Sequence, residues 1–138
     1  MTTYASRADI ESLYGPDFLA GLQPEGADLD AAVARAAADA DAEIDAYVGQ
    51  RHTLPLAAVP PILKACAIDI AVYRLANTWD RLTDEIRRRY DDRVKLLARI
   101  ADGKASAGII DPSPGGESVG GATSPDGAAF VSRPRRAW

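Results

Sequence analysis

The stretch PILKACAIDIAVYRLAN, residues 61–77, decides the fold of this chain. Its leading proline suits the first position of a helix, and its apolar side chains would occupy nearly every side of that helix. Its three charges, Lys64, Asp69 and Arg74, are five residues apart, so they point in directions about 140° from one another. A helix that is apolar almost all round lies inside a bundle. The sequence therefore predicts a central helix, surrounded by other helices or by neighbouring subunits.

Helical signals on both sides of this stretch supply the rest of the bundle. Asp28 is a typical N-cap, and the residues after it place apolar side chains on one stripe as far as Gly49, which is expected to follow the last turn. Thr83 caps the final helix, in which Glu85 and Arg89 form a favourable pair one turn apart. The expected elements are a short helix after Ser6, a short turn over 17–22, and long helices over 28–48, 61–77 and 83–102. We therefore predict an all-α fold, a small bundle of three to four helices.

The composition agrees with a small helical domain that has little core material. The chain has 138 residues, which is the size of one domain. Of its apolar residues 27 are alanine, the best helix former, which buries little area. Cys66 is the only cysteine, so no disulfide forms within the chain. No apolar stretch is long enough to span a membrane, and residues 1–13 lack the apolar block of a secretory signal.

The sequence contains few residues that stand out as catalytic groups or metal ligands. His52 is the only histidine and lies in a proline-rich connector, and Cys66 lies in the most apolar helix, where a thiol is usually inert. Acidic residues alternate along 39–45, which spreads them round a helix instead of gathering them into a metal cage. The glycine pairs at 115–116 and 120–121 lack the strand and helix that flank a phosphate loop. We expect no catalytic residue, no metal site and no cofactor.

The two parts of the chain differ strongly in charge. Residues 1–50 hold two basic and ten acidic residues, whereas residues 51–138 hold fourteen basic and ten acidic residues. This asymmetry suits head-to-tail contacts between copies of the chain, or two rims that face different partners. We predict a subunit interface between the acidic face of the helix over 28–47 and basic residues of the 83–102 helix. The interface residues are Asp39, Asp41, Asp45, Arg87, Arg88, Arg89 and Arg93.

The composition changes after Gly103. Residues 104–138 are rich in Gly, Pro and Ser and show no helical period, so the sequence predicts a helical domain over 1–103 and a flexible, extended docking arm over 104–138. A turn signal followed by apolar residues makes a short β-hairpin an option at the end of the arm. Aromatic and basic residues close to the C-terminus are expected to dock on another protein. They are Phe130, Val131, Arg133, Arg135, Arg136 and Trp138.

Nucleic-acid binding is the alternative that the sequence leaves open. Arg87, Arg88 and Arg89 are consecutive, but each has an acidic neighbour one turn away, which partly cancels their field. The acidic net charge of the chain is also unlike the basic footprint of a nucleic-acid-binding protein. A small DNA- or RNA-associated regulatory protein is therefore the alternative function.

Six segments, taken together and in order, carry a resemblance to a known family. The segments are YASRADI (4–10), AEIDAY (42–47), RHTLPL (51–56), VPP (59–61), DIAVYRL (69–75) and DEIRRRY (84–90). In this combination the chain resembles the head–tail connector, or adaptor, family of Mu-like tailed bacteriophages over residues 4–103. The element FVSR at 130–133 is similar to a terminal Phe-Ser-Arg element of such proteins, whereas residues 134–136 depart from the sequence expected after that element.

The resemblance implies a non-enzymatic virion component at the head–tail interface, made in the host cytoplasm during assembly. Such adaptors assemble as a ring, typically twelve-fold, beneath the portal protein. They extend the DNA channel and provide the docking face for a tail terminator or tail-completion protein. DNA would pass through the lumen without sequence readout, and no membrane would be involved. The central helix would place Asp69 and Arg74 inside the bundle or at the subunit boundary, with an internal salt bridge between the two as the alternative.

Overall fold

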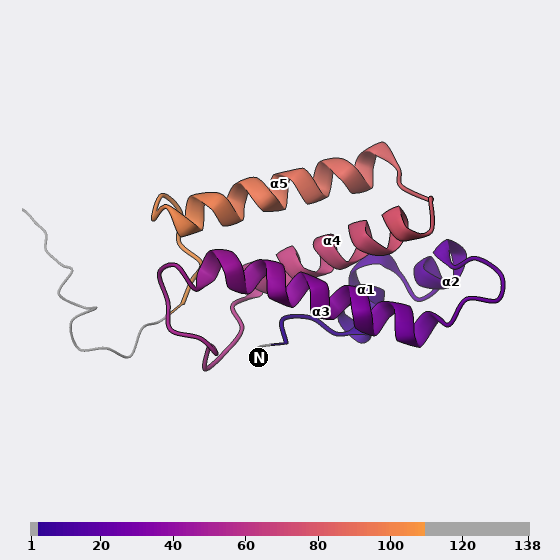
Figure 1. Cartoon of the computed structure of the whole chain (residues 1–138), viewed down its shortest axis with the longest axis horizontal. Coiled ribbons are helices and arrows are strands. Elements are labelled where there is room, and N and C mark those ends of the chain that lie inside the picture. The colour runs from indigo at the N-terminus through magenta and orange to yellow at the C-terminus, as the bar shows by residue number, and fades with distance from the viewer. Residues whose placement is uncertain (1–2, 110–138) are drawn as a thin grey trace, which may run out of the picture.

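The computed structural model describes residues 3–109, which fold into helices without any strand. Three long helices lie side by side as an antiparallel bundle, and two short helices pack near one end of it (Figure 1). This confirms the all-α fold expected from the sequence. The elements are α1 (Arg7–Tyr14), α2 (Phe18–Leu22), α3 (Leu29–Val48), α4 (Pro61–Thr78) and α5 (Asp84–Ala101).

Local signals fix where the helices begin. The side chains of Ser6, Asp28 and Thr83 each accept a hydrogen bond from a backbone N–H in the first turn of the helix that comes next. Each of these contacts satisfies a donor that has no partner within the helix. Pro61 is the first residue of α4, where the missing N–H of a proline costs nothing. The predicted starts of the three long helices are therefore confirmed to within one residue.

Two glycines end helices for different reasons. Gly103 comes after α5 with a φ of +80°, a left-handed conformation that side chains with a Cβ rarely adopt. Gly49 caps α3 but has a φ of −63°, so its role differs from the left-handed one that is typical of such a position. A Cβ at Gly49 would lie 2.8 Å from the carbonyl oxygen of Asp45 and 3.1 Å from Leu54 Cδ1. A side chain at Gly49 would therefore clash first with the backbone of α3 itself and then with Leu54 of the connector.

The helix over 61–78 is central, as its sequence predicts. It packs against both α3 and α5, and α1 covers a further side of it. Its buried residues lie on every side: Leu63, Cys66, Ala67, Ile68, Asp69, Ile70, Ala71, Val72, Leu75 and Ala76. The stripe expected on α3 is also buried at Val33, Ala36, Ala40, Ile44 and Val48. The core therefore has α4 as its axis.

The start of the arm packs on the bundle. Ala107 is only 3% exposed, and the Cβ position of Gly108 lies 3.8 Å from Pro60 Cβ in the connector between α3 and α4. Packing thus continues past Gly103 to at least Ala107. The option of a β-hairpin, and the rest of the expected arm, fall on residues 110–138 and lie outside the described residues. No helix within residues 3–109 combines the length and apolar character needed to cross a membrane.

Candidate functional site

A buried carboxylate joins three helices. Asp69 of α4 is 3% exposed and accepts hydrogen bonds from the Tyr14 hydroxyl and from Arg93 Nε, each at 2.7 Å. The guanidinium of Arg89 lies over the ring of Tyr14, 5.3 Å from its centroid. Asp69 therefore ties α1 and α5 to the central helix, and burial together with Asp69 raises the pKa of Tyr14 to about 12.

The salt bridge suggested between Asp69 and Arg74 is not formed, and this alternative was wrong. Arg74 Nη2 instead lies 2.7 Å from Glu43 Oε1 of α3. A separation of five residues turns the two side chains about 140° apart on the helix, so each faces a different neighbour. Asp69 faces α5 and α1, whereas Arg74 faces α3.

A second polar contact joins α3, α4 and α5. Glu43 accepts hydrogen bonds from Arg74 and, at 2.9 Å, from the Tyr90 hydroxyl. The rings of Tyr73 and Tyr90 stack with centroids 3.9 Å apart. Burial and the bond to Glu43 raise the pKa of Tyr90 to about 12. Glu43 thus joins α3 directly to α5 through Tyr90 and to the central helix through Arg74.

Removing the Tyr90 hydroxyl should measure this contact. Tyr90→Phe is expected to lower the free energy of unfolding by about 1 kcal/mol, the net value of one hydrogen bond. Tyr73→Phe is the matched control, because the Tyr73 hydroxyl has no hydrogen-bond partner within residues 3–109. Urea denaturation of both variants compares them. Equal losses in the two variants would contradict the role given to the Glu43 contact.

A third set of carboxylates is held differently. Asp41 is 4% exposed, and its Oδ1 accepts a hydrogen bond from the Tyr4 backbone N–H at 3.0 Å. Asp45, one turn further along α3, accepts from the Tyr4 hydroxyl at 2.5 Å. No lysine or arginine of the described residues forms an ion pair with either carboxylate. The expectation that Asp41 lies on an exposed acidic face was wrong, because the N-terminal segment covers it.

Burial raises the pKa of Asp41 above its ordinary value, and the nearby charge of Asp45 acts in the same direction. The hydrogen bond from Tyr4 N–H opposes both effects. An acid whose pKa is higher in the folded state favours folding most at low pH. That contribution is complete below the pKa of the unfolded chain and is lost as the pH rises through the raised pKa.

Asp41→Asn is therefore expected to stabilise the free protein at pH 7. The amide keeps an acceptor for Tyr4 N–H and removes the buried charge, so the free energy of unfolding should rise by about 1 kcal/mol, the order of the cost of burying a polar group. The variant should also gain less stability than the wild type between pH 7 and pH 4. Thermal unfolding at the two pH values measures both effects. A destabilised variant at pH 7 would contradict this account of Asp41.

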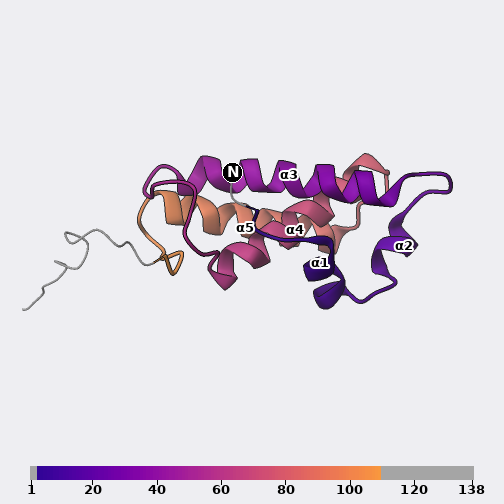
Figure 2. The same ribbon diagram turned by 90° about the horizontal axis from the view of Figure 1, so that it is seen from below.

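Asp41 borders a groove between the N-terminal segment, residues 3–6, and α3. Figure 2 shows that segment running beside α3 before it enters α1. The groove has a volume of about 370 Å³ and small side chains along most of its wall. Arg7 and Asp30, which form an ion pair with each other, stand at its rim. We call this hollow the Asp41 groove.

The predicted interface residues fall into three environments. Asp39, Arg87 and Arg88 are exposed. Arg89 contacts Glu85 at 2.6 Å, the pair expected from the sequence, and Arg93 is committed to Asp69. Asp41 and Asp45 both contact Tyr4. Arg87 and Arg88 therefore remain as adjacent exposed cations without an ion pair among residues 3–109. The predicted docking residues between 130 and 138 lie outside the described part of the chain.

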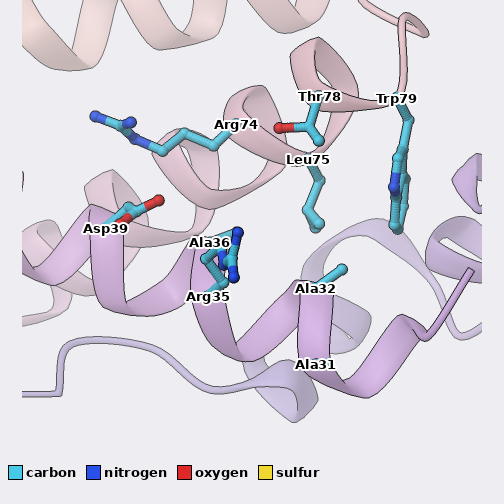
Figure 3. Close-up of a pocket in the computed structure, with 9 residues that line it drawn as sticks. All are labelled: Ala31, Ala32, Arg35, Ala36, Asp39, Arg74, Leu75, Thr78 and Trp79. Atoms are coloured by element: carbon cyan, nitrogen blue, oxygen red, sulfur yellow. The ribbon is translucent and has the colours of Figure 1, made fainter.

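A further groove of about 250 Å³ lies between α3 and the last turns of α4 (Figure 3). Its floor is apolar, Trp79 closes one end, and Arg35 and Asp39 project from α3. Its other charged residue, Arg74, is committed to Glu43. No group of three or more His, Cys, Asp or Glu residues in the described range could hold a metal ion. Burial raises the pKa of Cys66 to about 11, which makes its thiol unreactive at neutral pH.

Sequence comparison identifies the class of protein to which this helical bundle belongs. The chain is 37% identical over 125 residues to the Mu-like prophage FluMu protein gp36 of Haemophilus influenzae strain Rd, a match that covers 88% of this chain and 87% of that protein. It is 36% identical over 98 residues to Gene product J of Escherichia phage Mu, covering 69% and 68% of the two chains. These relatives make it a protein of Mu-like phages. Residues 4–123 match the family described as Bacteriophage Mu, Gp36, and the chain belongs to that family.

Proposed function

We propose that this protein is a head–tail connector, an adaptor that forms a ring under the portal protein, extends the DNA channel and docks the tail. The observation that carries the proposal is its kinship with proteins of Mu-like phages along most of its length. The kinship supports a role as a phage protein. The more specific role of a head–tail connector is what the resemblance described under Sequence analysis implies. The protein would act in the virion, after synthesis in the host cytoplasm, without a cofactor.

The arrangement of charge supports assembly into a ring. In Figure 1, α5 runs along the top edge of the molecule and the N-terminal segment runs along the opposite edge, below α3. The exposed cations Arg87 and Arg88 are on α5, and the Asp41 groove is beside the N-terminal segment. Contacts between unlike surfaces on opposite sides of a subunit join copies head to tail, and they close into a ring when the rotation per subunit divides the circle.

The partners of the proposed ring are set by its place between head and tail. The portal protein would lie on one side and a tail terminator or tail-completion protein on the other. The basic and aromatic residues near the C-terminus, Phe130 to Trp138, would dock on one of them. DNA would pass through the lumen and meet side chains without sequence readout.

The experiment that tests this function uses a Mu-like phage from which the gene is deleted. Lysates made without the gene should contain filled heads and free tails as separate particles, and a plasmid copy of the gene should restore joined particles. Electron microscopy of both lysates gives the readout. Joined, infectious particles in the absence of the gene would overturn the proposal. A shift of nonspecific DNA by the purified protein that weakens with salt would instead favour the nucleic-acid alternative.

A further inference from the structure

We propose that the Asp41 groove receives an arginine from the Arg87–Arg88 pair of a second copy of this chain. The inference rests on the proposed function and deepens it, because it names the contact that would join neighbouring subunits of the ring. The partner copy would supply the cation that the buried carboxylate lacks. Three features support this contact: the unequal pairing of the buried carboxylates, the shape of the groove and the positions of the exposed arginines.

The buried and half-buried carboxylates of α3 and α4 differ in whether they have a cation as partner. Asp69 pairs with Arg93 and Glu43 pairs with Arg74, each at 2.7 Å. Asp41 is as deeply buried as Asp69, but within residues 3–109 it and Asp45 contact Tyr4 and form no ion pair with a lysine or arginine. Buried carboxylates are normally paired with a cation or fully hydrogen-bonded. Among the described residues Asp41 is therefore a buried carboxylate that is held by a hydrogen bond alone, with no cation to neutralise its charge.

The groove leads a partner to Asp41. Its wall is formed by small residues and by the N-terminal segment, with Asp41 among the lining side chains. The residues that line it are Thr3, Ala5, Ser6, Arg7, Asp30, Val33, Ala34, Ala37, Ala38 and Asp41. Arg7 is a cation of this lining, but it is held by Glu11 and Asp30. The long aliphatic stem of an incoming arginine could lie on the alanines while its guanidinium reaches the carboxylate.

The chain itself carries suitable cations on its other side. Arg87 and Arg88 are exposed on α5 and have no ion-pair partner among the described residues, unlike Arg89 and Arg93. Figure 1 places α5 and the N-terminal segment at opposite edges of the bundle. An arginine on α5 therefore cannot reach the groove of its own chain, but it can reach that of a neighbour. The groove contains an acidic residue without a cation, and the exposed arginine pair is basic. Because one chain carries both surfaces, a second copy of this chain is the occupant that we propose.

Sedimentation equilibrium of the full-length protein tests the contact. The wild type should self-associate within a concentration range up to about 1 mM, the weak limit of a specific contact. Arg87→Glu/Arg88→Glu and Asp41→Asn should each raise the dissociation constant roughly thirtyfold or more, since each removes one partner of a desolvated charge pair. Combining the changes should weaken association no further than one of them does, because both remove the same interaction.

Matched variants separate this contact from general electrostatics and from unfolding. Lys104→Glu reverses one charge, half the charge change of the double arginine variant, at an exposed site beyond the far end of α5, and Asp39→Asn makes the same acid-to-amide change as Asp41→Asn outside the groove. Both should associate like the wild type. Circular dichroism should show unchanged helicity, and Asp41→Asn should be at least as stable as the wild type while it associates less. Loss of association together with a gain in monomer stability is not expected of a residue that only supports the fold.

Each outcome bears on the inference. A wild-type protein that stays monomeric throughout the range would overturn it, and so would association that survives Asp41→Asn. The second result would leave a ring formed through another surface, and with it the proposed function, intact. The protein could associate through the groove while deletion of its gene leaves heads and tails joined. That pair of results would uphold the inference and reject the proposed function.

Discussion

Asp69→Ala is expected to lower the free energy of unfolding by about 3 kcal/mol or more, the largest effect we expect of a single substitution. The carboxylate is buried and holds both Tyr14 of α1 and Arg93 of α5. Removing one partner of a buried ion pair leaves the other without compensation, at a typical cost of about 3–5 kcal/mol. The Arg93 side chain is 29% exposed, so water offsets part of that cost and places the expected value at the lower end.

Chemical denaturation with circular dichroism measures this loss, and the melting temperature should fall by roughly 10 °C or more. Asp91→Ala is the control, because Asp91 is exposed on the same helix that carries Arg93 and forms no ion pair within residues 3–109. It should change stability by less than about 0.5 kcal/mol. Asp69→Asn, which keeps an acceptor for Tyr14, should lose less than Asp69→Ala. A loss below about 1 kcal/mol for Asp69→Ala would show that the three-helix contact contributes little.

Deleting residues 126–138 is expected to abolish the joining of heads to tails while leaving the bundle folded. The described residues pack on the bundle as far as Ile109, and the deletion leaves that part of the chain unchanged. The deleted sequence contains Phe130, Trp138 and three arginines, the residue types that dominate interface energetics. If Phe130 and Val131 add as a strand to a partner, backbone pairing would give affinity and the phenyl ring specificity.

Complementation of the gene-deleted phage with the truncated protein measures the effect. Filled heads and free tails should accumulate separately, as they do without the gene, and the purified truncated protein should keep its helicity. A matched control replaces residues 113–124 by a Gly/Ser sequence of equal length, which retains the tip and should restore infectious particles. Wild-type titre from the truncated protein would show that the helical bundle makes the joint without the tip.

The helices could be predicted because their signals are local. The starts of α1 and of the three long helices are each marked by a residue that acts within the first turn of that helix. These residues are Ser6, Asp28, Pro61 and Thr83. The apolar residues of the 61–77 stretch were likewise sufficient to identify the central helix, since burial on all sides leaves no other position for it. Gly49 shows the limit of this reasoning. Its place at a helix end was predicted, but the close contacts that exclude a side chain there, with the Asp45 carbonyl and with Leu54, were not.

The polar contacts could not be predicted because their partners are distant in sequence. Asp69 meets Arg93 and Tyr14, which are 24 and 55 residues away. A charge in an apolar helix indicates that a partner exists, but it does not say which residue that partner is. Asp41 did carry a usable signal, since it lies four residues after Ala37 and three before Ile44, next to the buried stripe. The identity of its cover, Tyr4, depends on how the N-terminal segment returns along α3.

The way Tyr4 reaches α3 has a consequence for the order of folding. The long helices pair with neighbours in the chain, whereas Tyr4 contacts Asp41 and Asp45 across 37 and 41 residues. Because contacts between distant residues form more slowly than local ones, the helical hairpins should close first, and the N-terminal region, which also reaches Asp69 from Tyr14 across 55 residues, should dock after them. The wall of the Asp41 groove should therefore be built late in folding, together with the docking of α1. A subunit that presents the groove has docked its N-terminal region, so a ring closed through this surface would admit such subunits and leave out those that lack this contact.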